Sequence, residues 1–555
     1  MAAPSMPVPT KVPIPGHFAF EWPSPELEML PLLQDRQHMP NPMTPLAAWF
    51  AANGFAVGGT RALASYSVPM AFTCAHLNYY YYMAIAPNVP PEEIPEYEAR
   101  AMAAVVPAVM TFRTRWEQEW LPELQRTWAE WATFDLAGAT LPRLLERLEE
   151  CEALYHRIWE IHFSLLVPAF VGFSEFLGMH KQLFPEDGEM AAYRLMQGFD
   201  NKSLETDRAF WALSRRVASD PGLVETFKNN ASNDVREALA QTGAGRAFLD
   251  DVNAALAQWG RRSDTVQELG DPSWIEDPRP LFANIQAFLE KGEDPHHRHR
   301  AMSAERDAAI AAVRERLVNH PPEVRGQFEG LLWAAQSCSF LQEDHNYWID
   351  QRGLHEVRQV CMEVGRRLTA LGKLDRPGDV FMFTPPELRD LASGAETGAE
   401  TARQRRTEME YWATVTPPPM VGTDYGPPPD NPIVRAIERF FGAPPPASEE
   451  TIVRGHRGSA GKVRGVARLV MTIDDADRLA PGEILVAPTT SPPWTALFGT
   501  AAGIVTDTGG ALSHCAIVAR EYGIPAVVGT SVATATIRDG QEIEVDGDAG
   551  VVRLF

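Results

Sequence analysis

The length, composition and charge of the chain exclude several classes of protein. Its 555 residues are 45% hydrophobic and 22% charged, and at ~150 residues per domain such a chain predicts roughly three or four compact units. Lys and Arg total 50 against 73 Asp and Glu, a formal net charge of -23, and a surface this acidic repels phosphate backbones and anionic lipids. We therefore expect neither nucleic acid nor a membrane as a partner.

The sequence also indicates the compartment. No run approaches ~18 uninterrupted apolar residues, and the Pro-rich start, residues 1–15, lacks the charged flank and apolar centre of a secretory signal. The five cysteines are scattered without a Cys-x-x-Cys pair, which favours neither a disulfide framework nor a zinc site. These features predict a soluble, cytoplasmic protein.

The sequence changes in character near residue 415. Before it, apolar residues recur at three- and four-residue intervals, which predicts a large, mainly α-helical domain. The stretch 65–83 is compatible with a strand, and its residues 78–82 fit either element. The expected helices are 116–131, 141–163, 203–217, 235–259, 303–318 and 322–371.

Three proline triplets lie between residues 416 and 446, and consecutive prolines predict a stiff, extended connector. Short β segments follow it, with one helix expected at 513–522. The expected strands are 463–471, 483–488, 503–506, 526–529, 542–545 and 550–554. The predicted domains are an N-terminal extension (1–40), a mainly helical domain (41–415), a connector (416–453) and a C-terminal α/β domain (454–555).

The segment 506–521 has the pattern most typical of a catalytic site. Gly509 and Gly510 allow a tight turn with exposed backbone, and Ser513 is a good N-cap for the following helix. His514 would then lie at a helix N-terminus, where free amide groups and the helix dipole favour a phosphoryl group carried on the imidazole. A neutral imidazole is nucleophilic near pH 7. The alternative is that His514 is an ordinary capping or core residue.

This segment resembles a known domain. Residues 508–520 read Thr-Gly-Gly-x-x-Ser-His-x-Ala-Ile-x-x-Arg, with Pro-Pro-Trp-Thr before them (492–495) and Gly-Ile-Pro-Ala-Val-Val-Gly after them (523–529). The pattern resembles the swivelling phosphohistidine domain of the phosphoenolpyruvate-utilising enzymes, which include pyruvate phosphate dikinase, rifampicin phosphotransferase and phenylphosphate synthase. The resemblance implies that His514 is phosphorylated. It also implies that the loop around His514 and the helix behind it are formed with Thr508, Gly509, Gly510, Ser513, Arg520 and Glu521.

Two residues depart from the family pattern. Leu512 stands where plant pyruvate phosphate dikinase has a regulatory threonine, so control at that position is not expected. Cys515 stands where alanine is usual. We interpret Cys515 as a small buried thiol in preference to a redox residue.

A phosphohistidine needs a donor, and no segment resembles the Gly-rich loop, basic residues and carboxylates of an ATP-grasp site. The resemblance therefore implies a divided enzyme, a hetero-oligomer in which a separate ATP-grasp subunit binds ATP with Mg²⁺ or Mn²⁺. A helical acceptor domain followed by a swivelling domain resembles the later part of rifampicin phosphotransferase and the histidine-bearing subunit of phenylphosphate synthase.

The helical domain is then expected to bind the acceptor. On one helix His345 and Arg352 would share a face, with His345 as base toward the acceptor hydroxyl and Arg352 neutralising the phosphoryl group. The alternative is a solvated, charged helix face. Tyr347 and Trp348 are candidate substrate-binding residues, with the core as the alternative, and Arg262 is a second cationic candidate.

The metal ligands cannot be chosen from the sequence. Mg²⁺ or Mn²⁺ bound mainly through phosphate oxygens needs only one or two carboxylates. Residues 296–299, His-His-Arg-His, suggest a metal site, but their basic surroundings favour an exposed loop.

Together these observations predict a phosphotransferase subunit that works by ping-pong chemistry. The phosphoryl group would pass from His514 to the hydroxyl of a small molecule, for which a phenol or cresol-like alcohol of aromatic compound metabolism is the first choice. Two alternatives remain open. One is a rifamycin-type antibiotic phosphotransferase, and the other is a non-catalytic phosphocarrier or regulatory protein.

Overall fold

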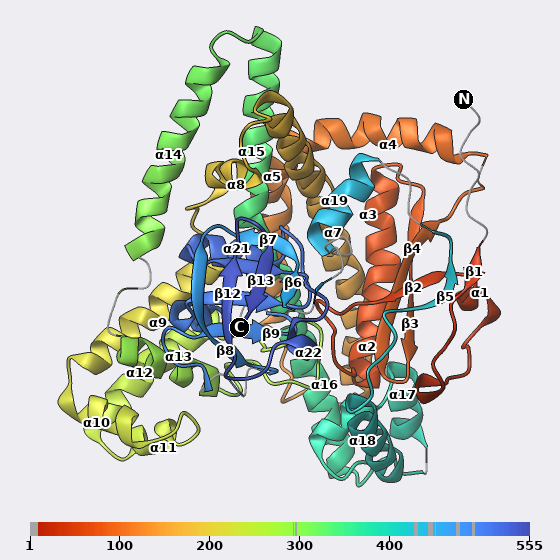
Figure 1. Ribbon diagram of the computed structural model, residues 1–555. Helices are drawn as coiled ribbons and strands as arrows, with labels where there is room; N and C mark the ends of the chain where they lie inside the picture. The colour runs from red at the N-terminus through yellow and green to blue at the C-terminus, as the bar shows by residue number, and fades with distance from the viewer. Residues whose placement is uncertain are drawn as a thin grey trace. The chain divides into compact units, whose positions relative to one another are not determined.

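The computed structural model describes residues 9–90, 92–291, 294, 297–394, 396–426, 431–441, 448–449, 451–472, 475, 478–490 and 494–555. The chain divides into two compact units, and each is described by itself. The first unit comprises Met1–Pro168, Thr265–Asp271 and Trp348–Asn431, and the second comprises Ala169–Asp264, Pro272–Tyr347 and Pro432–Phe555. Figure 1 shows the elements along the chain.

The first unit contains an antiparallel sheet with the strand order β1-β5-β2-β4-β3. Its strands are β1 (Thr10–Lys11), β2 (Pro31–Gln34), β3 (Met70–Leu77), β4 (Tyr80–Pro87) and β5 (Met420–Asp424). Asn78 and Tyr79 form the two-residue turn between β3 and β4, with φ values of 48° and 66°. Turns with both central residues at positive φ match the twist of a hairpin. The ambiguous residues 78–82 are therefore a turn followed by a strand.

Tyr80, Tyr81 and Tyr82 on β4 are buried in the first unit. The Tyr80 and Tyr82 hydroxyls donate hydrogen bonds to the carbonyls of Trp412 (3.0 Å) and Pro418 (2.8 Å). Buried tyrosines are normally hydrogen-bonded in this way, so these rings are core residues.

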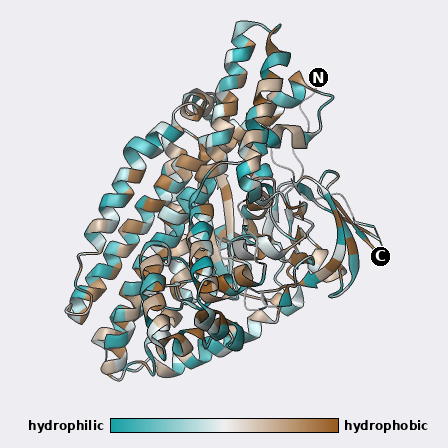
Figure 2. Cartoon of the chain, turned by 90° about the vertical axis from the view of Figure 1, so that its left-hand side faces the viewer, coloured by the Kyte–Doolittle hydropathy of each residue, from teal (hydrophilic) through white to brown (hydrophobic). Residues whose placement is uncertain are grey.

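Helices make up the rest of the first unit, and their hydrophilic and hydrophobic residues are shown in Figure 2. They are η1 (Gly16–Phe18), α1 (Pro25–Glu28), α2 (Pro45–Asn53), η2 (Gly54–Gly59), α3 (Thr60–Ser65), α4 (Ile94–Val109), α5 (Phe112–Arg115), η3 (Trp116–Trp120), α6 (Leu121–Trp131), η5 (Asn346–Gln351, beginning in the second unit), α16 (Arg352–Ala370), η6 (Pro377–Met382), α17 (Pro385–Ser393) and α18 (Ala399–Ala413).

The helix α7 (Leu141–Leu183) begins in the first unit and ends in the second. It extends beyond the predicted end at residue 163 and contains Pro168. Proline lacks an N–H and leaves the carbonyl four residues earlier without its helical partner. That carbonyl belongs to Ser164, and it accepts a hydrogen bond from the Tyr66 hydroxyl at 2.7 Å. The helix therefore continues past the proline.

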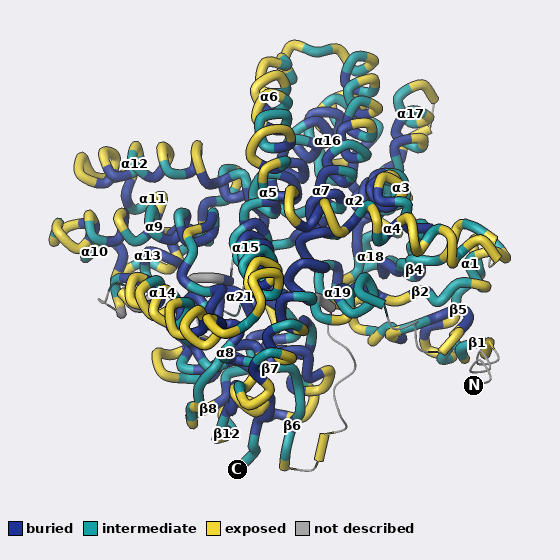
Figure 3. The backbone as a smooth tube through the Cα atoms, turned by 90° about the horizontal axis from the view of Figure 1, so that it is seen from above, coloured by how far each residue is buried: buried dark blue, intermediate teal, exposed yellow. Residues whose placement is uncertain are grey.

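In the described part of the chain, α7 is long and apolar enough to cross a membrane, but 78% of its most apolar window is buried inside the protein. Figure 3 shows this burial along the tube. Burial of this extent is typical of a core helix.

The second unit contains a helical part. Its helices are α8 (Glu189–Tyr193), η4 (Arg194–Met196), α9 (Lys202–Ala218), α10 (Pro221–Asn229), α11 (Val235–Ala240), α12 (Gly243–Trp259), α13 (Arg279–Lys291), α14 (His297–Leu317), α15 (Pro322–His345) and α19 (Pro432–Phe441). The predicted helix 235–259 is interrupted because Thr242 caps α12 by accepting a hydrogen bond from the Gly245 amide at 2.9 Å. Aromatic and aliphatic residues of α9 to α13 form one core.

The interpretation of residues 296–299 as an exposed loop is wrong for its described part. α14 begins at His297 and includes His299, whose side chain is buried and lies 3.3 Å from the Glu521 carboxylate. A buried carboxylate partner accounts for this burial of a polar ring. His296 lies outside the described residues.

The C-terminal part of the second unit is an α/β domain. Its strands are β6 (Ile452–Arg454), β7 (His456–Ser459), β8 (Lys462–Leu469), β9 (Ile484–Ala487), β10 (Gly503–Thr506), β11 (Ala526–Val528), β12 (Glu542–Asp546) and β13 (Val551–Leu554), and its helices are α20 (Thr495–Thr500), α21 (His514–Tyr522) and α22 (Ala533–Thr536). The predicted fold class, a mainly helical protein with a C-terminal α/β domain, is confirmed.

The sheet of this domain has the order β6-β13-β12-β8-β9-β10-β11-β7. Neighbouring strands from β8 to β11 run parallel, and the other printed pairs run antiparallel. One residue separates β6 from β7, although they lie at opposite ends of this order. The sheet must therefore curl until its two edges approach each other.

Parts of the predicted connector form regular secondary structure. β5 pairs with β1 and β2 in the first unit, and α19 covers the amphipathic stretch at its centre. Two of the three proline triplets, residues 427–429 and 444–446, lie outside the described residues.

We expect Gly529→Ala to destabilise the α/β domain. Gly529 follows β11 with φ +65°, and a Cβ there would meet the Gly509 carbonyl oxygen at 2.4 Å. The matched control is Gly540→Ala, which has φ +80° with nothing within 4 Å and loses only the left-handed backbone term of about 1–2 kcal/mol. Gly529→Ala should lose about 1–3 kcal/mol more. Urea denaturation of both variants measures this, and equal losses would contradict the close approach.

Candidate active site

His514 lies where parallel α/β sheets commonly bind ligands. β10 ends at Thr506, a loop leads to α21, and α21 returns to β11, which runs parallel to β10. The loop is therefore at the carboxyl end of a parallel strand, next to a helix N-terminus. Ser513 caps the helix by accepting a hydrogen bond from the Ala516 amide at 3.4 Å.

The predicted loop residues surround this turn. Gly509 has φ +101°, and a Cβ there would lie 2.7 Å from the Ser513 hydroxyl oxygen. The Gly510 carbonyl accepts a hydrogen bond from the Ser513 amide at 3.1 Å. Thr508 donates hydrogen bonds to the Pro488 carbonyl from its amide (3.1 Å) and its hydroxyl (3.2 Å). The loop shape thus depends on glycine conformation and on backbone hydrogen bonds.

Arg520 supports the loop from inside the domain. Its guanidinium donates hydrogen bonds to the Ala511 carbonyl (2.7 Å) and the Gly458 carbonyl (2.8 Å), and it lies over the Tyr193 ring. Cys515 is buried beside it, and burial raises the pKa of the Cys515 thiol to about 12. The structure thus agrees with the interpretation of Cys515 as a buried thiol, because little thiolate forms near neutral pH.

Glu343, near the end of α15, binds the imidazole of His514. The carboxylate oxygens of Glu343 lie 3.1 and 3.2 Å from His514 Nδ1. The Ser203 hydroxyl donates to the same carboxylate at 2.6 Å. All three side chains are 13% exposed or less. A helix of the helical part and a helix of the α/β domain thus meet at one buried histidine–carboxylate pair.

This pair fixes the chemistry of the ring. Burial alone would raise the pKa of Glu343, but the charge and hydrogen bond of His514 and the Ser203 hydroxyl lower it below its usual range. An ionised carboxylate holds the Nδ1 proton, which leaves a lone pair on Nε2. Nε2 is buried and has no hydrogen-bond partner in the described part of the chain. The arrangement is that of a nucleophilic imidazole oriented by a carboxylate.

Other charged groups surround the pair. Burial lowers the pKa of Arg262. Nearby groups that include Glu343 and Asp207 act in the opposite direction and raise it, but burial has the larger effect. Burial raises the pKa of Asp207 to about 6, although the hydrogen bond from Tyr522 acts in the opposite direction. Burial also raises the pKa of Asp344 to about 7, and its carboxylate accepts a hydrogen bond from the Lys202 amide at 2.9 Å. These residues provide a buried cation and two carboxyl groups that titrate near neutral pH.

Arg262 and Tyr347, both predicted from the sequence, lie next to each other in the second unit. The Arg262 guanidinium carbon is 5.0 Å from the centre of the Tyr347 ring. Tyr347 also packs against Trp259, and its hydroxyl donates to the Gln258 carbonyl at 2.7 Å. Arg262 is buried and donates a hydrogen bond to the Lys202 carbonyl at 3.3 Å. Their substrate-binding role stays a prediction.

The helical register assumed for His345 and Arg352 is wrong. α15 ends at His345, and the π-helical segment η5 (Asn346–Gln351) separates it from α16. A π-helical segment shifts the faces of the residues that follow. His345 is buried, with Nδ1 2.8 Å from the Leu341 carbonyl. Arg352 belongs to the first unit, where it pairs with Glu356 at 2.7 Å.

Trp348 likewise belongs to the first unit. Its carbonyl accepts a hydrogen bond from the Trp128 indole at 3.0 Å. Its predicted contact with a substrate remains untested.

Sequence reasoning missed Glu343, Ser203 and Asp207. Glu343 stands two residues before His345, and side chains two apart on a helix point in different directions. The sequence alone therefore does not show which face of α15 points toward His514. Ser203 and Asp207 are four residues apart on α9 and share a face, which was the available signal.

Two family models match this chain. The mobile domain of PEP-utilising enzymes matches residues 479–550, and the fourth domain of rifampicin phosphotransferase matches residues 166–343. The first match contains His514, and the second contains Ser203, Asp207 and Glu343. The chain thus contains a region that matches the PEP-utilising mobile domain and a region that matches a rifampicin phosphotransferase domain.

Curated relatives extend this result. Chondramide synthase cmdD of Chondromyces crocatus is 36% identical over 98% of this chain but only 14% of its own length. The uncharacterised phosphotransferase YvkC of Bacillus subtilis is 31% identical over 75% of this chain and 49% of its own length. A rifampicin phosphotransferase of Streptomyces sviceus is 28% identical over 64% of this chain and 40% of its own length. The chain thus spans half or less of each of these relatives.

We expect Glu343→Gln to slow phosphoryl transfer from phospho-His514 to an acceptor. The carboxylate keeps the ring in the Nδ1-protonated tautomer as the N–P bond breaks, and a neutral amide does not, so the transfer rate should fall by about 10²-fold or more. Rapid-quench measurement of the loss of acid-labile phosphate from isolated phosphoenzyme gives this rate. The control is Glu323→Gln, an exposed carboxylate on the same helix. Equal rates in the two variants would refute this role of Glu343.

Proposed function

We propose that this chain is the histidine-bearing and acceptor-binding part of an ATP-dependent, dikinase-type phosphotransferase. The observation that supports the proposal is the geometry at His514, where Glu343 engages Nδ1 and leaves Nε2 buried and without a partner. The family match over residues 479–550 and relatives named as phosphotransferases support the same chemistry.

In the first half-reaction the Nε2 lone pair attacks the β-phosphorus of ATP. An N–P bond forms, the P–O bond to AMP breaks, and hydrolysis of the transferred diphosphate releases inorganic phosphate and leaves phospho-His514. The Nδ1 proton stays on the ring, which carries a positive charge once the N–P bond has formed. The helix N-terminus and loop amides would interact favourably with the phosphoryl oxygens.

In the second half-reaction the acceptor hydroxyl attacks phosphorus and the N–P bond breaks. We assign Arg262 the role of binding the phosphoryl oxygens, because it is a buried cation and its neighbours include Glu343 and Asp207. The hydroxyl proton needs a base. Asp207, whose pKa is raised to about 6 by burial, is suited to accept it near neutral pH, and His345 is the candidate that the sequence predicts.

The donor in this proposal is an ATP-grasp protein outside this chain. Mg²⁺ or Mn²⁺ would arrive with the nucleotide, bound mainly by phosphate oxygens. Among the described residues near His514, Glu343 already accepts from Ser203 and Asp207 from Tyr522. We therefore assign the cation to the nucleotide and name no ligand for it on this chain.

The acceptor is proposed to be an organic hydroxyl compound, with a small phenol or cresol as the first candidate. A rifamycin-type acceptor is the second candidate, and the match of residues 166–343 to a rifampicin phosphotransferase domain favours it. A panel that contains phenol, a cresol and a rifamycin separates the two.

We expect intact-mass analysis to find an acid-labile phosphate on the chain after incubation with ATP, Mg²⁺ and the ATP-grasp protein. The phosphate should be absent without the ATP-grasp protein and absent in His514→Ala. Phosphorylation of His514→Ala would refute the proposed carrier. Phosphorylation by ATP alone would refute the separate donor.

The base is tested by separating the half-reactions. If His345 is the base, His345→Ala should form phosphoenzyme at the normal rate but transfer to an acceptor at least about 10²-fold more slowly. If Asp207 is the base, Asp207→Asn should show this split and His345→Ala should not. Single-turnover transfer from isolated phosphoenzyme measures both variants.

A further inference from the structure

One face of α9 contributes to contacts at both ends of α21. The helix α21 begins at His514 and ends at Tyr522, slightly more than two turns later. At its start, the Ser203 hydroxyl donates to Glu343, which binds His514. At its end, the Tyr522 hydroxyl donates a hydrogen bond to Asp207. Ser203 and Asp207 are four residues apart and share a face of α9, so the arrangement that forms one contact also forms the other.

The contact between Tyr522 and Asp207 is buried, with the two residues 8% and 5% exposed. Burial, followed by the charge of Asp207, raises the pKa of Tyr522 well above its usual value, so the hydroxyl keeps its proton and remains a donor. Burial also raises the pKa of Asp207 to about 6, whereas the hydrogen bond from Tyr522 lowers it. The hydroxyl therefore acts against burial and favours the ionised carboxylate.

Other charged groups act on Asp207 in the same direction as Tyr522. Those that lower its pKa are Arg262, His514 and Arg208. The helix α15 also packs against α9 and carries Glu343 and Asp344, whereas α20 packs there without a charged residue. The helices α10, α12 and α13 pack against α9 and share an apolar core with it. Of the groups that favour the ionised carboxylate, the α/β domain contributes His514 and Tyr522.

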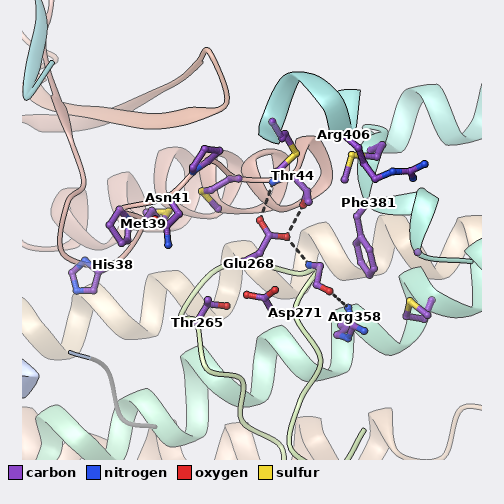
Figure 4. Close-up of a pocket in the computed structure, with 18 of the residues that line it drawn as sticks. His38, Met39, Asn41, Thr44, Thr265, Glu268, Asp271, Arg358, Phe381 and Arg406 are labelled. Atoms are coloured by element: carbon purple, nitrogen blue, oxygen red, sulfur yellow. Dashed lines mark hydrogen bonds between the residues drawn. The ribbon is translucent and has the colours of Figure 1, made fainter. Parts of the chain in front are cut away.

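Glu268 in the first unit is a buried carboxyl group that is held differently. It lies at the wall of a cavity and accepts hydrogen bonds from the Thr44 amide (2.8 Å), the Thr44 hydroxyl (2.7 Å) and the Gly270 amide (2.6 Å) (Figure 4). Burial raises the pKa of Glu268 to about 7, although these donors lower it. The donors belong to the same unit as Glu268. The donor to Asp207 instead stands on the helix that carries His514.

We propose that Tyr522 is a positioning residue for the base of the second half-reaction: its hydroxyl orients the Asp207 carboxylate and favours its ionised form when α21 lies against α9. The inference rests on the proposed function, in which Asp207 accepts the proton of the acceptor hydroxyl. Because Tyr522 and His514 stand on one helix, the movement that brings the phosphoryl group to the helical part also brings the donor to the base. The base is then ionised in the arrangement in which transfer takes place.

Infrared difference spectroscopy on the unphosphorylated full chain measures the ionisation of Asp207. Subtracting the spectrum of Asp207→Asn at each pH leaves the carboxylic acid band of Asp207, and the bands of other carboxyl groups such as Glu268 cancel. In the natural chain this band should disappear with a midpoint near pH 6. In Tyr522→Phe, with the double variant Tyr522→Phe/Asp207→Asn as its blank, the midpoint should be about one to two pH units higher, because a hydrogen bond to an ionised carboxylate is lost.

The matched control is Tyr193→Phe. It removes a buried tyrosine hydroxyl that donates to Glu189 at 3.2 Å, and it should leave the Asp207 midpoint unchanged. A second variant, with fluorotyrosine at position 522, keeps the test decisive if Tyr522→Phe fails to fold. Fluorine makes the hydroxyl a stronger hydrogen-bond donor, so the Asp207 midpoint should fall. A midpoint that is the same in the natural chain and in the position 522 variants would overturn the proposal.

The consequence for transfer is measured on isolated phosphoenzyme with phenol, a cresol and a rifamycin as acceptors. In Tyr522→Phe the acidic limb of the single-turnover pH–rate profile should move upward by the same one to two units or about that, while the rate at alkaline pH approaches that of the natural chain. A loss of rate that is equal at every pH would indicate a structural role only and would overturn the proposal. Absence of phosphate on His514 would instead refute the proposed function and leave the Asp207 midpoint measurable, so the two failures are distinct.

Discussion

The hydrogen bond between His514 and Glu343 is the interaction on which the candidate site depends. His514 stands at a helix N-terminus, next to free amide groups and the positive end of the helix dipole. Glu343 engages Nδ1, and Nε2 has no partner among the described residues. Ser203 in turn holds the carboxylate at 2.6 Å. The surroundings of the imidazole are therefore set by residues from three helices, of which only one belongs to the α/β domain.

Much of the α/β domain was predictable because its signals are local. The strand β10 has the predicted bounds, α21 begins one residue later than predicted, and Gly509 takes the positive φ that the double glycine suggested. The short strands β6 and β7 were missed, since an element of three or four residues has too little sequence pattern to detect. Glycine, capping and strand alternation act within a few residues and can be recognised in one sequence.

The helical side of the candidate site was harder to predict because it depends on packing between distant segments. Glu343 and Ser203 are 140 positions apart, and no periodicity links them. The π-helical η5 shifted the face of α16, so the expected register between His345 and Arg352 was wrong. The continuation of α7 through Pro168 depends on Tyr66, about a hundred residues away. Such long-range hydrogen bonds override local propensity and leave no trace in a single sequence.

The packing of α21 in the second unit has a consequence for any phosphohistidine mechanism. Glu521 accepts hydrogen bonds from the Gly198 amide at 2.9 and 3.1 Å, Tyr522 donates to Asp207, and Leu204 of α9 lies in the core of the α/β domain. Nε2 is buried in this arrangement, so a nucleotide cannot reach it while the arrangement persists. Some of the contacts are polar, and burial raises the pKa of Asp207, one of the groups involved, to about 6. Polar interfaces separate at lower cost than apolar ones. A domain that must alternate between a donor and an acceptor requires this kind of interface: specific enough to align His514 with Glu343, yet not so apolar that it becomes permanent.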